Sequence, residues 1–125
     1  MNSYKYLKIF PTRLSNGLRV IVAENKKAPV ICINVAYKTG SKNENPGKTG
    51  FAHLFEHLMF EGSQNIQKGD FDKLCSMAGG TNNAYTNFDL TSYYMTLPAN
   101  QLELGLWLES DRMAAPASFT LSSGR

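Results

Sequence analysis

The hydrophobic and polar positions along the chain form blocks of two kinds. Short apolar runs rich in β-branched and aromatic residues predict three strands. Apolar residues three and four positions apart predict three helices. The predicted strands span residues 18–23, 30–37 and 90–97, and the predicted helices span about residues 50–61, 71–77 and 100–113.

Turn residues between these blocks set the limits of the first helix. A loop over residues 39–48 is crowded with Gly, Asn and Pro, and Thr49 after it is a suitable N-cap. Gly62 is the next stop signal, so we expect a helix of about three turns. Read from this pattern alone, residues 83–86 favour a plain turn that leads into the strand 90–97.

The order of the elements indicates the fold class. It reads strand, strand, helix, helix, strand, helix, without the regular β-α-β alternation of a doubly wound sheet. This order favours an α+β domain. The first two strands, 18–23 and 30–37, are joined by a short connection, and we expect them to be neighbours.

Composition narrows the classes of partner. The chain has 125 residues, 42% of them hydrophobic and 18% charged, which is typical of one globular domain. A net charge of +3 spread over scattered lysines excludes a basic stripe for nucleic acid. No apolar run is long enough to cross a bilayer, and residues 1–10 do not resemble a secretory signal. We therefore expect a cytoplasmic protein without a membrane or nucleic-acid partner.

The segment His53-Leu54-Phe55-Glu56-His57 carries the candidate chemistry, and it holds both histidines of the chain. Residues four apart share one face of a helix, so His53 and His57 can reach one zinc ion. Zinc lowers the pKa of its bound water to about 7, and the Glu56 carboxylate can then act as general base. The alternative is that the two histidines are ordinary surface residues of an amphipathic helix.

This inverted motif resembles that of the pitrilysin and insulysin family of zinc peptidases, which includes the mitochondrial processing peptidases. The resemblance covers about residues 14–113. The positions that carry it outside the motif are 17–20, Gly40-Ser41, Gly47, 49–52, 59–62, Gly79-Gly80, 83–86, Asp89, Thr91, Tyr93 and 106–113.

The resemblance implies a fold, an activity and a mode of substrate binding. It implies the N-terminal part of a domain like those of the mitochondrial processing peptidases, with a mixed sheet and helices packed on one face. The implied activity is that of a zinc-dependent metalloendopeptidase acting in a chamber formed by two related halves. It also places Asn83, Ala84 and Tyr85 on an edge strand beside the zinc, where an extended peptide substrate can add as a further strand.

The resemblance also implies what this chain lacks. The family's third zinc ligand is a glutamate that falls beyond Arg125. We therefore predict a partial zinc-peptidase domain over residues 1–113, a non-matching tail over residues 114–125 typical of a truncated product, and no activity of the chain alone. The alternative is a non-catalytic subunit that binds peptides or serves as a scaffold.

Overall fold

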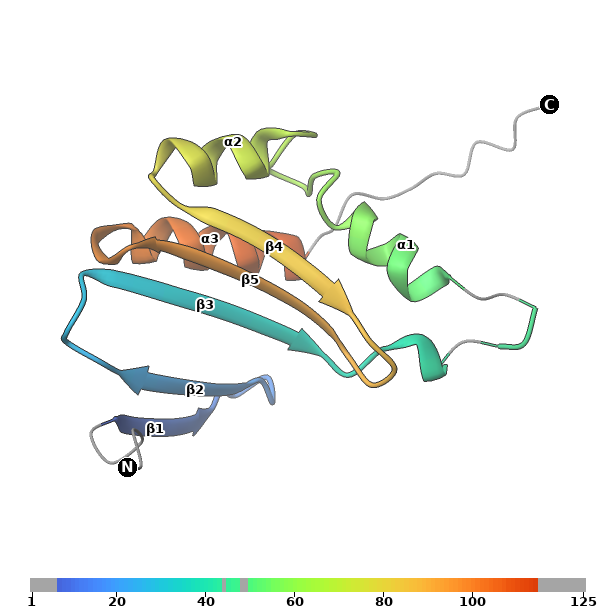
Figure 1. Cartoon of the computed structure of the whole chain (residues 1–125), viewed down its shortest axis with the longest axis horizontal. Coiled ribbons are helices and arrows are strands. Elements are labelled where there is room, and N and C mark those ends of the chain that lie inside the picture. The colour runs from blue at the N-terminus through green and yellow to red at the C-terminus, as the bar shows by residue number, and fades with distance from the viewer. Residues whose placement is uncertain (1–6, 44, 48–49, 115–125) are drawn as a thin grey trace.

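The computed structural model describes residues 7–43, 45–47 and 50–114. These residues form five strands, three α-helices and two short 3₁₀ helices (Figure 1). In chain order they are β1 (Lys8–Arg13), β2 (Arg19–Glu24), β3 (Val30–Tyr37), η2 (Ser41–Asn43), α1 (Phe51–Leu58), α2 (Asp70–Met77), β4 (Thr81–Thr86), β5 (Thr91–Pro98), η3 (Ala99–Gln101) and α3 (Leu102–Ala114).

The strands form two sheets. Strands β1 and β2 pair as an antiparallel hairpin, and β3, β5 and β4 form a three-stranded sheet in that order. Both pairs in the larger sheet are antiparallel. The expectation that strands 18–23 and 30–37 are neighbours is therefore wrong, since β2 pairs with β1 and β3 pairs with β5.

The wrong pairing follows from the failure to predict β1. Its residues are all exposed and include Pro11, so the segment lacks the alternation of a half-buried strand. Asn16-Gly17, a typical turn pair, closes the β1–β2 hairpin. Gly17 has φ 91°, and its N–H donates to the Leu14 carbonyl at 2.9 Å.

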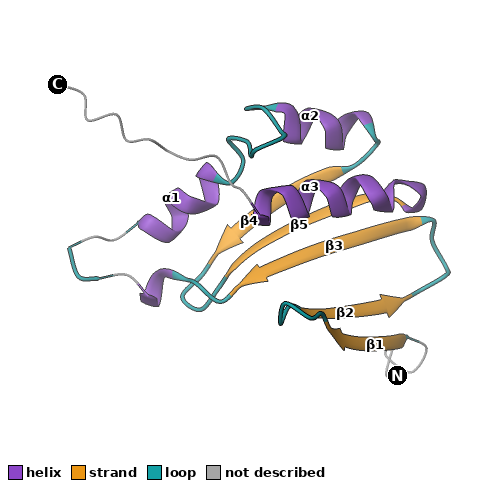
Figure 2. Cartoon of the chain, turned by 180° about the vertical axis from the view of Figure 1, so that it is seen from behind, coloured by secondary structure: helices purple, strands orange, loops and turns teal. Residues whose placement is uncertain are grey.

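One face of the three-stranded sheet carries the helices. Along β5, residues 91, 93, 95 and 97 are buried and point to this face, where Met95 and Leu97 pack with Phe71, Cys75 and Leu108. Figure 2 shows α2 and α3 lying over this side of the sheet. The α+β class and the packing of helices on one face are confirmed. The expected mixed sheet is not seen among the described residues, where every strand pair is antiparallel.

Helix α1 is shorter than predicted. It ends at Leu58, four residues before Gly62, because the next N–H groups bond at closer spacing: Phe60 to the His57 carbonyl at 3.1 Å, and Glu61 to the Leu58 carbonyl at 3.0 Å. The N-cap position is held by Gly50 with φ 92°, whereas the predicted cap Thr49 lies outside the described residues.

The other predicted elements lie within a few residues of their expected places. Helix α2 ends before Gly79, which has φ 86° as a C-terminal glycine requires. Strand β5 and helix α3 match the predictions for 90–97 and 100–113.

Residues 83–86 lie in β4, so the plain-turn reading was wrong and the edge strand implied by the family resemblance is observed. Among the described residues, no helix is long and apolar enough to cross a membrane.

Candidate metal centre

His53 and His57 come together on the exposed face of α1. Their Nε2 atoms lie 3.0 Å apart, and the ring planes are nearly perpendicular, with centroids separated by 4.5 Å. Both residues are exposed. Because they are one helical turn apart, the helix places both rings on one face, as the spacing predicted.

The spacing of the two nitrogens fits one shared zinc ion. Zinc binds imidazole nitrogen at about 2.0–2.1 Å, so nitrogens 3.0 Å apart can both reach a single ion. Within the part of the chain that the structure describes, no cluster of three or more His, Cys, Asp or Glu side chains is arranged to hold a metal. His53 and His57 could thus supply two of the three protein ligands that a catalytic zinc site ordinarily takes.

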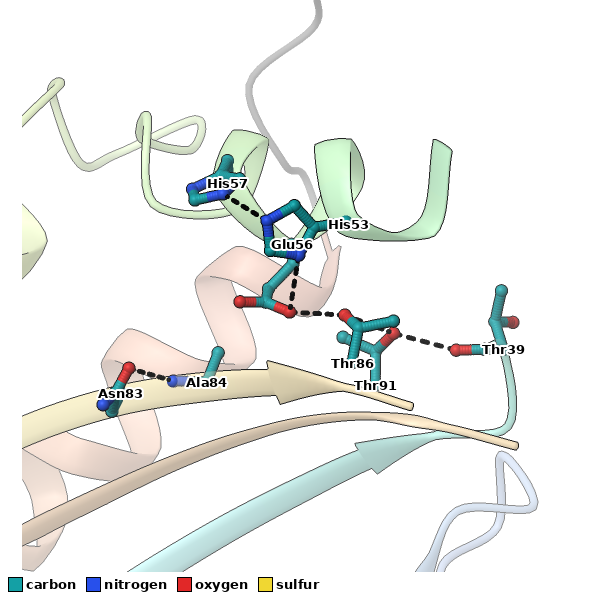
Figure 3. A network of polar contacts seen from close by, with 8 residues as sticks. All are labelled: Thr39, His53, Glu56, His57, Asn83, Ala84, Thr86 and Thr91. Atoms are coloured by element: carbon teal, nitrogen blue, oxygen red, sulfur yellow. Dashed lines mark hydrogen bonds and ion pairs between the residues drawn. The ribbon is translucent and has the colours of Figure 1, made fainter. Parts of the chain in front are cut away.

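Glu56 lies on the sheet side of α1, below His53 (Figure 3). Only 8% of the residue is exposed, and its Oε2 lies 3.8 Å from His53 Nδ1. The Thr86 hydroxyl on β4 donates a short hydrogen bond to the same Oε2. The other carboxylate oxygen points away from this hydroxyl (Figure 3). The strand therefore holds the candidate base by one oxygen.

A second threonine extends the contact to the loop after β3. Thr86 and Thr91 are directly paired across β4 and β5, and their hydroxyl oxygens lie 3.3 Å apart. Thr91 donates to the Thr39 carbonyl at 2.8 Å. Each hydroxyl has one proton to donate: Thr86 donates it to Glu56, and Thr91 donates it to the Thr39 carbonyl. In this arrangement the two hydroxyls are in contact but neither donates to the other.

The predicted substrate residues lie on β4, an edge strand whose outer side pairs with no strand among the described residues. Their burial alternates, with Asn83 and Tyr85 exposed and Ala84 half-buried on the helix side. Asn83 Oδ1 accepts the Ala84 N–H at 2.8 Å (Figure 3). A peptide that adds to this edge must therefore replace the Asn83 side chain at that N–H.

An open groove of about 520 Å³ runs beside this edge. One wall comes from the end of α1 and the residues after it, namely His57, Phe60 and Glu61. The opposite wall comes from α2 and β4, with the lining residues Asp72, Ser76, Gly80, Thr81, Asn82 and Asn83. The groove thus extends from His57, the second histidine of the motif, to the edge strand β4.

Sequence reasoning did not assign a role to the threonines at Glu56. Thr86 directly precedes the four-residue turn 87–90, and Thr91 directly follows it. In a hairpin with this turn, the two threonines must lie opposite each other, so the sequence carries a signal for their pairing. No local pattern indicates that this strand pair lies under α1. The contact joins residues 30 apart in the chain.

Comparison with known proteins identifies the family. The sequence model described as "Insulinase (Peptidase family M16)" matches residues 19–121, which include part of the predicted tail. The chain is 40% identical over 117 residues to the zinc protease PqqE of Helicobacter pylori, covering 92% of this chain and 26% of that protein. It is 31% identical over 100 residues to the mitochondrial-processing peptidase subunit beta of Blastocladiella emersonii, covering 80% and 22%.

Two solved structures have a similar fold. A crystal structure of a protease from Helicobacter pylori superposes with a TM-score of 0.87 at 38% identity, over 91% of this chain and 27% of that one. Pitrilysin shares the fold with a TM-score of 0.83 at 24% identity, over 91% and 12%. The chain spans about a quarter of the length of the curated relatives cited above. It belongs to the insulinase family of peptidases, peptidase family M16.

Proposed function

We propose that this chain supplies two ligands and the general base of a zinc-dependent metalloendopeptidase. The observation that carries the proposal is the convergence of the His53 and His57 Nε2 atoms, 3.0 Å apart, beside a buried Glu56 fixed by Thr86. The relatives named zinc proteases support zinc as the metal. We propose one ion because the described residues bring one pair of imidazole nitrogens together. His53, Glu56 and His57 are the residues we assign to it.

The side chains divide the chemistry between them. When bound, zinc acts as a Lewis acid that makes water a nucleophile near neutral pH. His53 and His57 hold the metal on the exposed face of α1. The Glu56 carboxylate accepts the proton of the attacking water and can return it to the leaving amine. Its hydrogen bond from Thr86 keeps the carboxylate in one orientation during both transfers.

We further propose that an extended peptide or unfolded segment binds along β4. The outer edge of this strand and the groove beside it run toward His57, so a peptide paired with Asn83, Ala84 and Tyr85 would lie next to the metal. Main-chain pairing recognises a peptide with few sequence demands. This mode suits an endopeptidase that acts on many segments.

The site needs a further ligand. The described residues hold no three-residue metal group, and the family resemblance places the third ligand beyond Arg125. We therefore propose that a further segment, and a second homologous domain or subunit, complete the enzyme, and that the 125-residue chain alone does not cleave peptides. A cytoplasmic location stays a prediction from the sequence.

A non-catalytic subunit that binds peptides is the second candidate. It is favoured by the incomplete ligand set among the described residues. It gives no reason for a buried carboxylate held beside two convergent imidazoles. The two candidates differ in whether Glu56 is needed for bond cleavage when the site is complete.

A chimera separates them. Residues 19–113 would replace the matching segment of the Helicobacter pylori protease, which superposes over 91% of this chain. Peptide cleavage that a chelator stops and Glu56→Gln abolishes is the expected result. A folded, zinc-loaded chimera that binds peptide without cleaving it would support the non-catalytic subunit instead.

A further inference from the structure

The last turn of α3 lies against the segment that follows the metal-binding helix. Asp111 and Arg112 stand side by side there, and neither has a role in the site described above. Each contacts a different part of residues 60–66, which we call the exit segment because the chain leaves α1 through it.

Asp111 binds the exit segment with both carboxylate oxygens. Oδ2 accepts the Ser63 hydroxyl in a short bond and the Asn65 backbone N–H at 3.2 Å, while Oδ1 accepts the Asn65 side-chain amide at 2.6 Å. These bonds, that from Ser63 first, lower the pKa of Asp111 below its ordinary value. The carboxylate is thus charged and fully engaged at neutral pH.

The exit segment is itself a tight turn. The Ser63 N–H donates to the Ile66 carbonyl at 2.8 Å, and Ile66 is buried in the core. Gly62 has φ 127°, and a Cβ there would lie 2.6 Å from the same Ile66 carbonyl. Only glycine fits at this position of the turn that Asp111 holds.

Arg112 holds the start of the exit segment. The side chain is buried, and its guanidinium carbon lies 5.2 Å from the ring centroid of Phe60, 4.2 Å from that of Phe71 and 4.4 Å from that of Tyr93. Its Nη2 also donates to Glu109 at 2.6 Å. Cation–π contacts of this kind strengthen when they are desolvated. Phe60 is thereby fixed three residues after His57.

We infer that Asp111 and Arg112 are positioning residues for the second zinc ligand. This inference rests on the proposed function. Helix α1 has eight residues, too few to be stable alone, so the direction of His57 in its last turn depends on tertiary anchors. Thr86 holds the sheet side of α1 through Glu56, and the two α3 residues hold the exit segment that follows its C-terminal end. Together they keep the His57 ring against His53.

The first test uses the complete metal-free chain and NMR contacts between the two histidine rings. Asp111→Asn keeps the size of the side chain but removes its charge. It also replaces one accepting oxygen by a donating amide, which cannot accept from Asn65. It is expected to weaken the His53–His57 ring contacts and to speed amide exchange in residues 60–66. Ser63→Ala removes one bond from the turn side and should act in the same direction. Glu103→Gln, an exposed carboxylate change in the first turn of α3, is the matched control.

The second readout is zinc affinity, measured by titration with the metal alone. The Asp111 variant is expected to bind zinc about three- to tenfold more weakly, at the lower end of the effect of groups that orient ligands. Unchanged ring contacts in both the Asp111 and Ser63 variants, or an equal loss in Glu103→Gln, would overturn the inference. A wild-type chain with intact ring contacts that binds no zinc would overturn the proposed function alone.

Discussion

The Thr86 hydroxyl donates a hydrogen bond to Oε2 of Glu56, joining the edge strand β4 to helix α1 at the candidate base. In the proposed enzyme, the bond ties together the edge that would bind the peptide and the carboxylate that would move the proton. It also gives a hydrogen-bond donor to one carboxylate oxygen of Glu56, a residue that is only 8% exposed. A buried charge without such a donor is costly.

Replacing Thr86 by Val should destabilise the chain, because the isosteric change leaves the Glu56 oxygen without its donor. The expected loss is about 1–3 kcal/mol in the free energy of unfolding, measured by urea denaturation. Thr81→Val is the control, since Thr81 is exposed on the same strand. Equal stabilities for the two variants would show that the bond contributes nothing.

Removing either histidine should weaken zinc binding by about tenfold or more, because the described site has only two imidazole ligands. Zinc titration of His53→Ala and His57→Ala against the wild-type chain measures this. Glu61→Gln is the control, since Glu61 lines the groove next to His57 and pairs with Lys68 at 2.6 Å. An equal loss in the Glu61 variant would assign that residue to the metal.

Gly40→Ala should destabilise the loop before α1. A Cβ at Gly40 would come within 2.5 Å of the backbone of Phe88 in the β4–β5 turn. That turn also accepts the Ser41 N–H at 2.9 Å. We expect a loss of about 1–3 kcal/mol from overpacking, measured by thermal or urea unfolding. Ser41→Ala, at an exposed neighbour, should change stability by less than about 0.5 kcal/mol.

The stabilising effect of Asp111 should depend on pH. Its pKa is lowered in the folded chain by the bonds from Ser63 and Asn65, so folding favours the charged form. The advantage over Asp111→Asn should be complete above the ordinary Asp pKa of about 3.9 and should disappear as pH falls through the folded value. Urea unfolding at several pH values checks this. A difference that stays constant down to the most acid pH would contradict it.

Local spacing alone determined the chemistry of the motif and several elements. Residues four apart on a helix lie on one face whatever surrounds them, so the sequence alone placed His53 and His57 on the same face of α1. The limits of α2 and β5 followed in the same way from periodicity and from Gly79 and Pro98. The early end of α1 did not follow from the sequence. Before Gly62 is reached, the N–H groups of Phe60 and Glu61 donate to carbonyls three residues earlier, which ends the α-helical pattern.

Only the tertiary structure decided which elements meet. Strand β2 found its partner in β1, a segment without the alternation that marks a strand, and residues 83–86 became an edge strand instead of a turn. The bond from Thr86 to Glu56 spans 30 positions, and that from Ser63 to Asp111 spans 48. Periodicity is a property of neighbouring residues, whereas such contacts depend on how the whole core packs. The sequence therefore indicated the two candidate ligands and the candidate base, and the fold decided what holds them in place.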